Sequence, residues 1–129
     1  MRRLAILLLT SAALPLAFFG AEPQRTSPSP LARVPDRAHA LVNPFAGDTD
    51  AALGGRKVYE RNCARCHEEN KRGQRRGPAL AQQVSSASAG AVFWVIKHGN
   101  RSQGMPSWGE LPEQQIWQIV GYLKTRKTE

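Results

Sequence analysis

The residues best suited to chemistry are the two cysteines of the chain, which lie in the stretch RNCARCHEEN at residues 61–70. Cys63, Cys66 and His67 are spaced i, i+3 and i+4, so their side chains share one face of a helical turn. A disulfide between the thiols would close only a tiny loop and could not hold a fold together. A dithiol redox pair is typical of a βαβ unit, for which the sequence has no strand pattern. A structural zinc site needs four ligands, and only His98 or His39 could join Cys63, Cys66 and His67, which would be an unusual set.

The spacing Cys-x-x-Cys-His is the attachment motif of c-type haem. Two thiols on one helical face can add to the two vinyl groups of the porphyrin, while the imidazole reaches the iron from the same side. The second ring N–H of the histidine then requires an acceptor of its own. We therefore predict one haem c and its iron, held covalently by Cys63 and Cys66, with His67 as an axial ligand.

The sixth position of the iron needs a donor from the opposite face. Met105 lies between Gly104 and Pro106, and it is the only methionine besides Met1. A methionine in such a loop is less easily explained as core packing than one inside a helix. His98 is the alternative donor, but it ends an apolar segment, where a capping role suits it. We predict Met105, because His/Met ligation is the recognised electron-transfer arrangement for this haem.

Helices must position these residues, because no part of the chain alternates convincingly in the manner of a strand. Asp48 or Asp50 can cap a helix that leads into the cysteine motif. We expect the inner face of this helix to carry Leu53, Val58 and Tyr59.

Two further helices are expected downstream. Ser86 or Ser88 can cap an apolar segment that Gly99 ends. In the last helix the apolar residues recur at helical spacing, at Ile116, Trp117, Val120 and Leu123. Long loops in so small a domain usually wrap something. The sequence therefore predicts an all-α fold of three to four short helices and long loops around one covalently bound haem.

The chain divides into three parts by composition. A positively charged start and an apolar run up to residue 21 predict a signal peptide over residues 1–21, and hence export to the periplasm. Left uncleaved, residues 4–21 could anchor the protein in the membrane, although they are barely long enough to span it; after cleavage no membrane span is expected. We expect residues 22–43, which are rich in proline, to form a flexible tether, and residues 44–127 to form the folded domain.

The net charge of +8 belongs mainly to the expected domain. One group of basic residues follows the cysteine motif and comprises Lys71, Arg72, Arg75 and Arg76. It is either a solvated loop or a docking patch for an acidic redox protein, which would act mainly on the encounter rate. Nucleic acid is not expected as a partner, because the chain is exported and has no motif for binding it.

From about Pro44 to the end, the sequence resembles a class I c-type cytochrome with a single haem. The segment GRKVYERNCARCH is similar to the first helix and haem site of that family, and IVGYLK is similar to its last helix. The resemblance implies that Gly55 and Tyr59 pack against the last helix where the two helices cross closely, with Gly121 on the other side.

Two loops extend the resemblance to the haem pocket. The segment GPAL is similar to the part in which the carbonyl of Pro78 would accept the second N–H of His67 and Leu80 would cover the haem. The segment GMPSWG resembles the loop of the axial methionine. More narrowly, the second half of the chain is similar to small cytochromes that accompany periplasmic quinoprotein alcohol dehydrogenases.

The resemblance implies a monomeric, periplasmic carrier of single electrons rather than an enzyme, working between a dehydrogenase and an oxidase or another acceptor. Two filled axial positions would leave no site for a substrate. The alternatives are a haem enzyme or gas-binding sensor, should Met105 leave the sixth position open, and a dedicated cytochrome subunit of a dehydrogenase complex.

Overall fold

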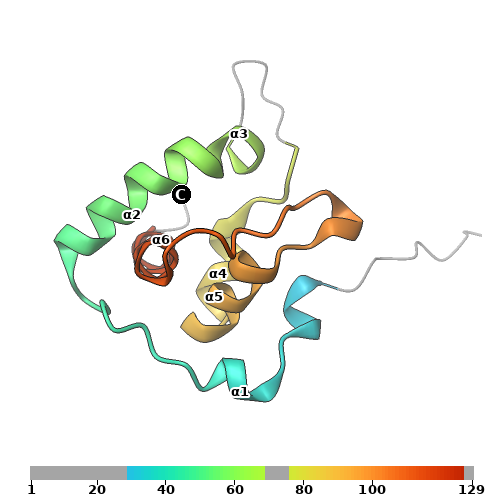
Figure 1. Ribbon diagram of the computed structural model, residues 1–129, viewed down its shortest axis with the longest axis horizontal. Coiled ribbons are helices and arrows are strands. Elements are labelled where there is room, and N and C mark those ends of the chain that lie inside the picture. Colours follow the sequence, from blue (N-terminus) through green and yellow to red (C-terminus); the bar gives the residue numbers. More distant parts are fainter. Residues whose placement is uncertain (1–28, 69–75, 127–129) are drawn as a thin grey trace, which may run out of the picture.

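The computed structural model describes residues 29–68 and 76–126, and within these ranges it contains helices and no strands (Figure 1). The elements in chain order are η1 (Pro30–Arg33), α1 (Asp36–His39), α2 (Thr49–Asn62), α3 (Ala64–His67), α4 (Leu80–Ser86), α5 (Ala89–His98), η2 (Arg101–Gln103) and α6 (Glu113–Thr125). The all-α prediction is confirmed, although the described residues form more helices than the three to four expected. The additional ones are short turns of three to seven residues.

Local side-chain caps begin the longer helices. Asp48 rather than Asp50 caps α2, accepting a hydrogen bond from the backbone N–H of Ala51 at 2.9 Å. Ser88 rather than Ser86 caps α5 in the same manner. Each cap satisfies a backbone donor that the first turn of a helix leaves free.

Gly99 ends α5 in a backbone conformation that only glycine adopts readily, with a φ of 70°. A Cβ at this position would also lie 2.5 Å from the backbone of Pro106. The chain can therefore leave α5 and turn at once into the loop that carries Met105, as predicted for a helix that ends at Gly99.

The core lies where α5 and α2 pack against α6. Tyr59, Ile116, Ile119 and Val120 are its largest fully buried side chains. The ring of Trp117 stacks on Phe93 with their centroids 4.1 Å apart, which joins α6 to α5. The prediction that Leu53 faces this core is wrong, because 57% of its surface is exposed. The buried face of α2 instead carries Ala51, Gly55, Val58 and Tyr59.

The helices α2 and α6 cross at very close range, which Figure 1 shows near one side of the molecule. A Cβ at Gly55 would lie only 2.0 Å from the carbonyl oxygen of Gln118. The close crossing at Gly55 is confirmed, but its opposite side is formed by the backbone of Gln118 and Ile119. Gly121 was expected there, but a Cβ added to Gly121 would meet the side chain of Asn43, at 3.5 Å, and not α2.

This crossing yields a prediction about stability. Replacing Gly55 with alanine is expected to lower the free energy of unfolding by about 1–3 kcal/mol, because the methyl group overpacks against backbone that cannot rotate away. Chemical denaturation of the purified holoprotein measures the change.

Gly54 provides the matched control in the same turn of helix. A Cβ there would meet only the side chain of Gln118, at 3.6 Å, which is an ordinary contact. Gly54→Ala should therefore be neutral or gain up to about 1 kcal/mol from helix propensity. Equal effects of the two substitutions would contradict the close crossing.

Residues 29–43, which we call the N-terminal strap, differ from the flexible tether predicted for residues 22–43. The strap carries η1 and α1, and its residues Val34 and Ala38 are buried against Ala91 of α5. Asn43, also buried, donates a hydrogen bond to the carbonyl of Trp117 at 3.0 Å. Two prolines interrupt the strap, so the apolar side chains that dock it do not form one continuous helical pattern in the sequence.

Residues 22–28 of the expected tether lie outside the described residues, as does the expected signal peptide over residues 1–21. Among the residues that the structure does describe, no helix is long and apolar enough to cross a membrane. The expected division of the chain at residue 44 stays a prediction.

Candidate functional site

The cysteine motif forms a helical turn at the end of α2. The backbone N–H groups of Cys66 and His67 both donate to the carbonyl of Cys63, each at 3.0 Å. The backbone N–H of Cys63 donates a hydrogen bond to the carbonyl of Tyr59 at 2.8 Å, so the turn continues α2. The predicted i, i+3, i+4 arrangement is therefore present, and it places both thiols and the imidazole on one face.

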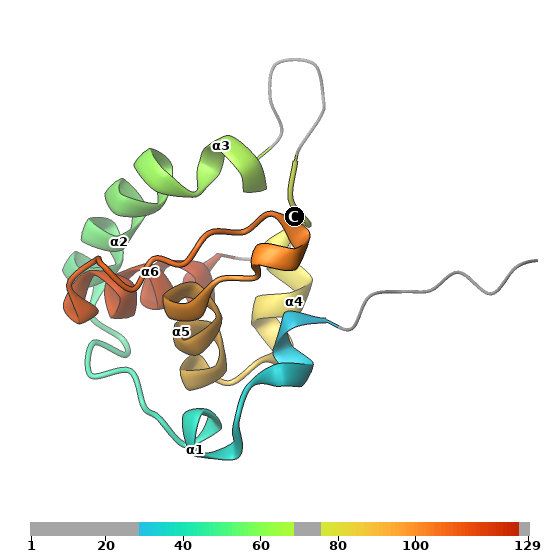
Figure 2. The same ribbon diagram turned by 45° about the vertical axis from the view of Figure 1, so that its right-hand side comes forward.

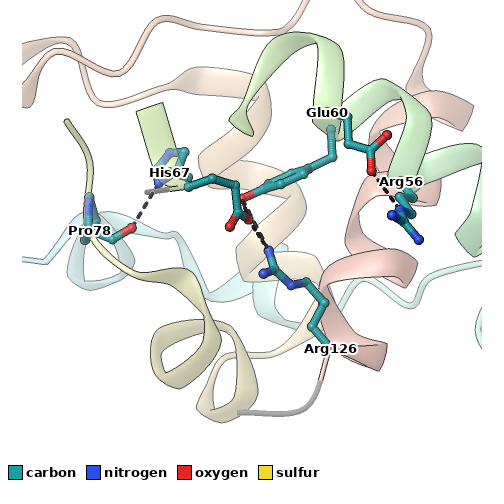
Figure 3. A network of polar contacts seen from close by, with 7 residues as sticks. Arg56, Glu60, His67, Pro78 and Arg126 are labelled. Carbon is teal, nitrogen blue, oxygen red and sulfur yellow. Dashed lines mark hydrogen bonds and ion pairs between the residues drawn. The ribbon is translucent and has the colours of Figure 1, made fainter. Parts of the chain in front are cut away.

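The imidazole of His67 is oriented by the segment that follows residue 75. Its Nδ1 lies 3.1 Å from the carbonyl oxygen of Pro78, the contact expected for this pair (Figure 3). The backbone N–H of Gly77 donates to the carbonyl of Cys66 at 2.8 Å, which holds the segment against the turn. With Nδ1–H donated to a carbonyl, Nε2 carries the lone pair that a metal ligand needs.

Gly77 makes room for this imidazole. A Cβ at its position would lie 3.0 Å from both Cε1 and Nδ1 of His67, which is closer than side chains normally pack. The glycine of the GPAL segment therefore allows the backbone to approach the ring edge. Leu80 begins α4 two residues after Pro78 and is half-buried against the core.

Both thiols are free and half-exposed. Burial raises the pKa of Cys63 to about 11, and the neighbouring Cys66 adds to this. A thiol with such a pKa remains protonated at neutral pH and is a poor nucleophile for disulfide exchange.

A polar cluster next to His67 was not foreseen from the sequence. Glu68 accepts hydrogen bonds from the hydroxyl of Tyr59 at 2.9 Å and from the guanidinium of Arg126 at 2.5 Å (Figure 3). Burial, followed by this bond to Glu68, raises the pKa of Tyr59, so the phenol stays a neutral donor. The cluster ties the end of α6 to the residue after the imidazole. No sequence signal joins Glu68 to Arg126, because they are 58 positions apart.

Met105 lies in the loop after α5 and is half-buried. Its N–H and carbonyl pair with those of Asn100 across a short antiparallel bridge. Gly104, just before it, has a φ of 84° and so turns the chain in a way that suits glycine. In both views the loop, coloured orange, lies toward the same end of the molecule as α3 (Figures 1 and 2).

His98, the alternative donor, is engaged within its own helix. Its Nδ1 lies 2.8 Å from the carbonyl of Trp94, and its ring stacks on that of Trp94 with centroids 4.3 Å apart. The imidazole is thus held at the end of α5, where a histidine can cap free carbonyls. This agrees with the structural role expected for it.

The residues present fit a covalently attached haem better than a metal ion. Among the described residues, no group of three or more His, Cys, Asp and Glu side chains converges as a metal site would, and structural zinc needs four ligands. The thiols instead lie side by side on one helical face with an oriented imidazole. Half-buried apolar side chains pack against the core from α4 and from the loop before α6; they include Leu80, Trp108 and Leu111. Such side chains can cover a flat apolar ligand.

The helical fold and this turn define the domain as a c-type cytochrome. A family model described as cytochrome c oxidase, cbb3-type, subunit III matches residues 50–123, and the chain belongs to this family. Covalently bound haem c with its iron, as predicted, is the cofactor of such a domain.

Two curated relatives are subunits of cbb3-type cytochrome c oxidases. Subunit FixP of Azorhizobium caulinodans is 30% identical over 111 residues, which cover 77% of this chain and 35% of that protein. Subunit CcoP of Azospirillum sp. (strain B510) is 31% identical over 88 residues, which cover 57% of this chain and 30% of the relative. The chain therefore spans about a third of the length of these relatives.

These comparisons support haem-based electron transfer and the expected cytochrome c class. The narrower resemblance to cytochromes of quinoprotein alcohol dehydrogenases is not confirmed, since the matched family and both relatives are oxidase subunits. No comparison tests the individual ligands, so the roles of the cysteines, His67, Pro78, Leu80 and Met105 at the haem remain predictions.

Proposed function

We propose that the protein carries single electrons through a haem c attached to Cys63 and Cys66, with His67 and Met105 as axial ligands. The observation that carries this proposal is the turn of α3, where both thiols share a face with an imidazole whose Nδ1 is bonded to Pro78. Bound haem supplies a one-electron iron couple. The chain contributes attachment, orientation of the imidazole, and apolar side chains that exclude water.

We further propose that the protein is an electron carrier or a subunit of a larger assembly rather than an enzyme. With His67 and Met105 both bound, the iron would offer no position to a substrate. Ligation by methionine in an apolar pocket favours a positive potential, which suits delivery of electrons to an oxidase.

The proposed electron acceptor is a terminal oxidase. Both curated relatives are named as subunits of cbb3-type oxidases, which supports this partner over the alcohol dehydrogenase suggested by the narrower resemblance. The proposed electron donor in this scheme is a dehydrogenase. The proposed location is the periplasm, with residues 1–21 directing export or, left uncleaved, anchoring the chain.

Redox titration and carbon monoxide binding of the purified holoprotein test this function together. We expect a single one-electron transition, oxidation of the reduced protein by membranes that contain a cbb3-type oxidase, and no binding of carbon monoxide to the ferrous haem. Tight binding of carbon monoxide would instead favour the gas-binding alternative with an open sixth position.

The basic group after the cysteine motif gives a prediction about docking. Reversing the charges of Lys71, Arg72, Arg75 and Arg76 is expected to slow oxidation by the oxidase membranes and to flatten its salt dependence. The reason is that charge complementarity acts mainly on the association rate and is screened beyond about 10 Å at 0.1 M salt. Stopped-flow kinetics at several ionic strengths measure the effect.

Of these four residues, Arg76 is described and exposed, and the other three lie outside the described residues. Arg37 on α1 gives a matched single control, because it is also exposed and α1 lies at the end of the molecule opposite α3 (Figures 1 and 2). Arg76→Glu should slow the reaction more than Arg37→Glu. If the oxidation rate depends on neither the salt concentration nor the charge reversals, the basic group is a solvated loop and not a docking patch.

A further inference from the structure

Asn100 is a buried polar residue at the start of the loop that carries Met105, with only 4% of its surface exposed. Its side-chain amide donates to Gln103 Oε1 at 2.6 Å, and its Oδ1 accepts from the hydroxyl of Ser102 at 3.1 Å. Its backbone N–H donates to the carbonyl of Met105 at 2.8 Å, and the N–H of Met105 donates back at 3.1 Å. The part of the loop from Asn100 to Met105 therefore closes on Asn100.

Arg33 reaches the same side chain from the N-terminal strap. Its Nη2 donates a hydrogen bond to Asn100 Oδ1, although the two residues are 67 positions apart. A hydrogen bond from a guanidinium is stronger than one between neutral groups. Since Asn100 is buried, losing this donor would leave its oxygen with fewer partners where water has little access.

Packing of the N-terminal strap against α5 fixes the backbone next to Arg33. Val34, the next residue, packs with Ala38 against Ala91 of α5. Gly90 lets the strap approach α5, because a Cβ there would lie 1.9 Å from the carbonyl oxygen of Ala38. The strap is therefore fixed to the helix that leads directly into the Met105 loop, and η1 lies beside this helix.

We propose that Arg33 is a positioning residue for Met105, which it holds on the iron through Asn100. This inference rests on the proposed ligation by Met105. The backbone bridge makes Met105 and Asn100 move together, and Arg33 ties Asn100 to a segment outside the loop. The matched family model begins at residue 50, so Arg33 lies in a part of the chain that this family model does not cover.

A loosened loop exposes the iron to competing ligands. Arg33→Ala is expected to raise the association constant of the ferric holoprotein for imidazole by about tenfold, the ratio that corresponds to the net loss of one hydrogen bond to a charged group. Arg33→Lys, which keeps a charge but lacks the planar fork of donors, should fall between this variant and the wild type.

Arg37→Ala is the matched control. Arg37 lies on the same strap, is also exposed, and makes no side-chain hydrogen bond among the described residues. It should leave imidazole binding unchanged. Amide hydrogen exchange gives a second measurement that does not depend on an added ligand: the N–H groups of Asn100 and Met105 should exchange faster in Arg33→Ala than in Arg37→Ala.

Met105→Ala, measured in parallel, separates the two proposals. If it leaves imidazole binding and the methionine-to-iron charge-transfer band unchanged, the proposed ligation is wrong and the inference fails with it. If Met105→Ala removes the band but Arg33→Ala binds imidazole as the wild type does, the ligation stands and the positioning role is overturned. A general loss of stability in Arg33→Ala, with wild-type imidazole affinity, also overturns it.

Discussion

Replacing both Cys63 and Cys66 with alanine is expected to abolish covalent haem attachment. The two thiols lie on one turn of helix, and each would form one bond to the porphyrin. The single variants should retain one bond, so that haem survives denaturation in reduced yield. Mass spectrometry of the denatured protein measures the outcome: the wild type should exceed its polypeptide mass by one haem and the double variant by none.

Loss of the haem should also destabilise the fold. A cofactor that binds only the native state stabilises it through mass action, and the half-buried side chains of Leu80 and Trp108 would lose a neighbour. The thermal transition of the double variant should therefore fall well below that of the wild type.

Arg65→Ala provides the control within the same turn. Arg65 lies between the two cysteines but is exposed, so its loss should change neither the mass of the denatured protein nor its thermal transition appreciably. Wild-type protein that carried zinc or a Cys63–Cys66 disulfide in place of haem would contradict the proposed attachment.

The sequence predicted features that depend on neighbours along the chain. The spacing of Cys63, Cys66 and His67 determines their common face, because a helical turn repeats every 3.6 residues. The caps Asp48 and Ser88 were each one of two candidates, since a cap needs only the right side chain just before the helix. Helix ends shift easily by a residue or two, so the spacing alone did not choose between the candidates.

Features that depend on distant contacts were predicted less well. Leu53 lies five positions before Val58 and six before Tyr59, so it falls off their helical face. The small residues Ala51 and Gly55 are buried on that face instead, and at Gly55 the backbone of α6 comes close. The composition of the N-terminal strap indicated a tether, although a few small side chains suffice to dock it on α5. The bond between Arg33 and Asn100 had no signal in the sequence, since polar pairing across 67 positions follows from the fold.

Met105→Ala is expected to change the haem more than any other single substitution outside the cysteine motif. Without the thioether, the sixth position opens, and the ferrous protein should bind carbon monoxide while the ferric protein binds cyanide. The methionine-to-iron charge-transfer band should disappear. The midpoint potential should fall, because methionine ligation raises the potential of a c-type haem. Optical spectra and a redox titration measure all of these changes.

His98→Ala is the decisive comparison, because His98 is the one other donor that the sequence suggested. Its ring stacks on Trp94 and its Nδ1 lies 2.8 Å from the carbonyl of that residue, so its loss should affect only the end of α5. The potential, the charge-transfer band and the resistance to carbon monoxide should all stay close to those of the wild type. If His98→Ala opened the iron and Met105→Ala did not, His98 would be the sixth ligand. The loop closed by Asn100 would then have only a structural role.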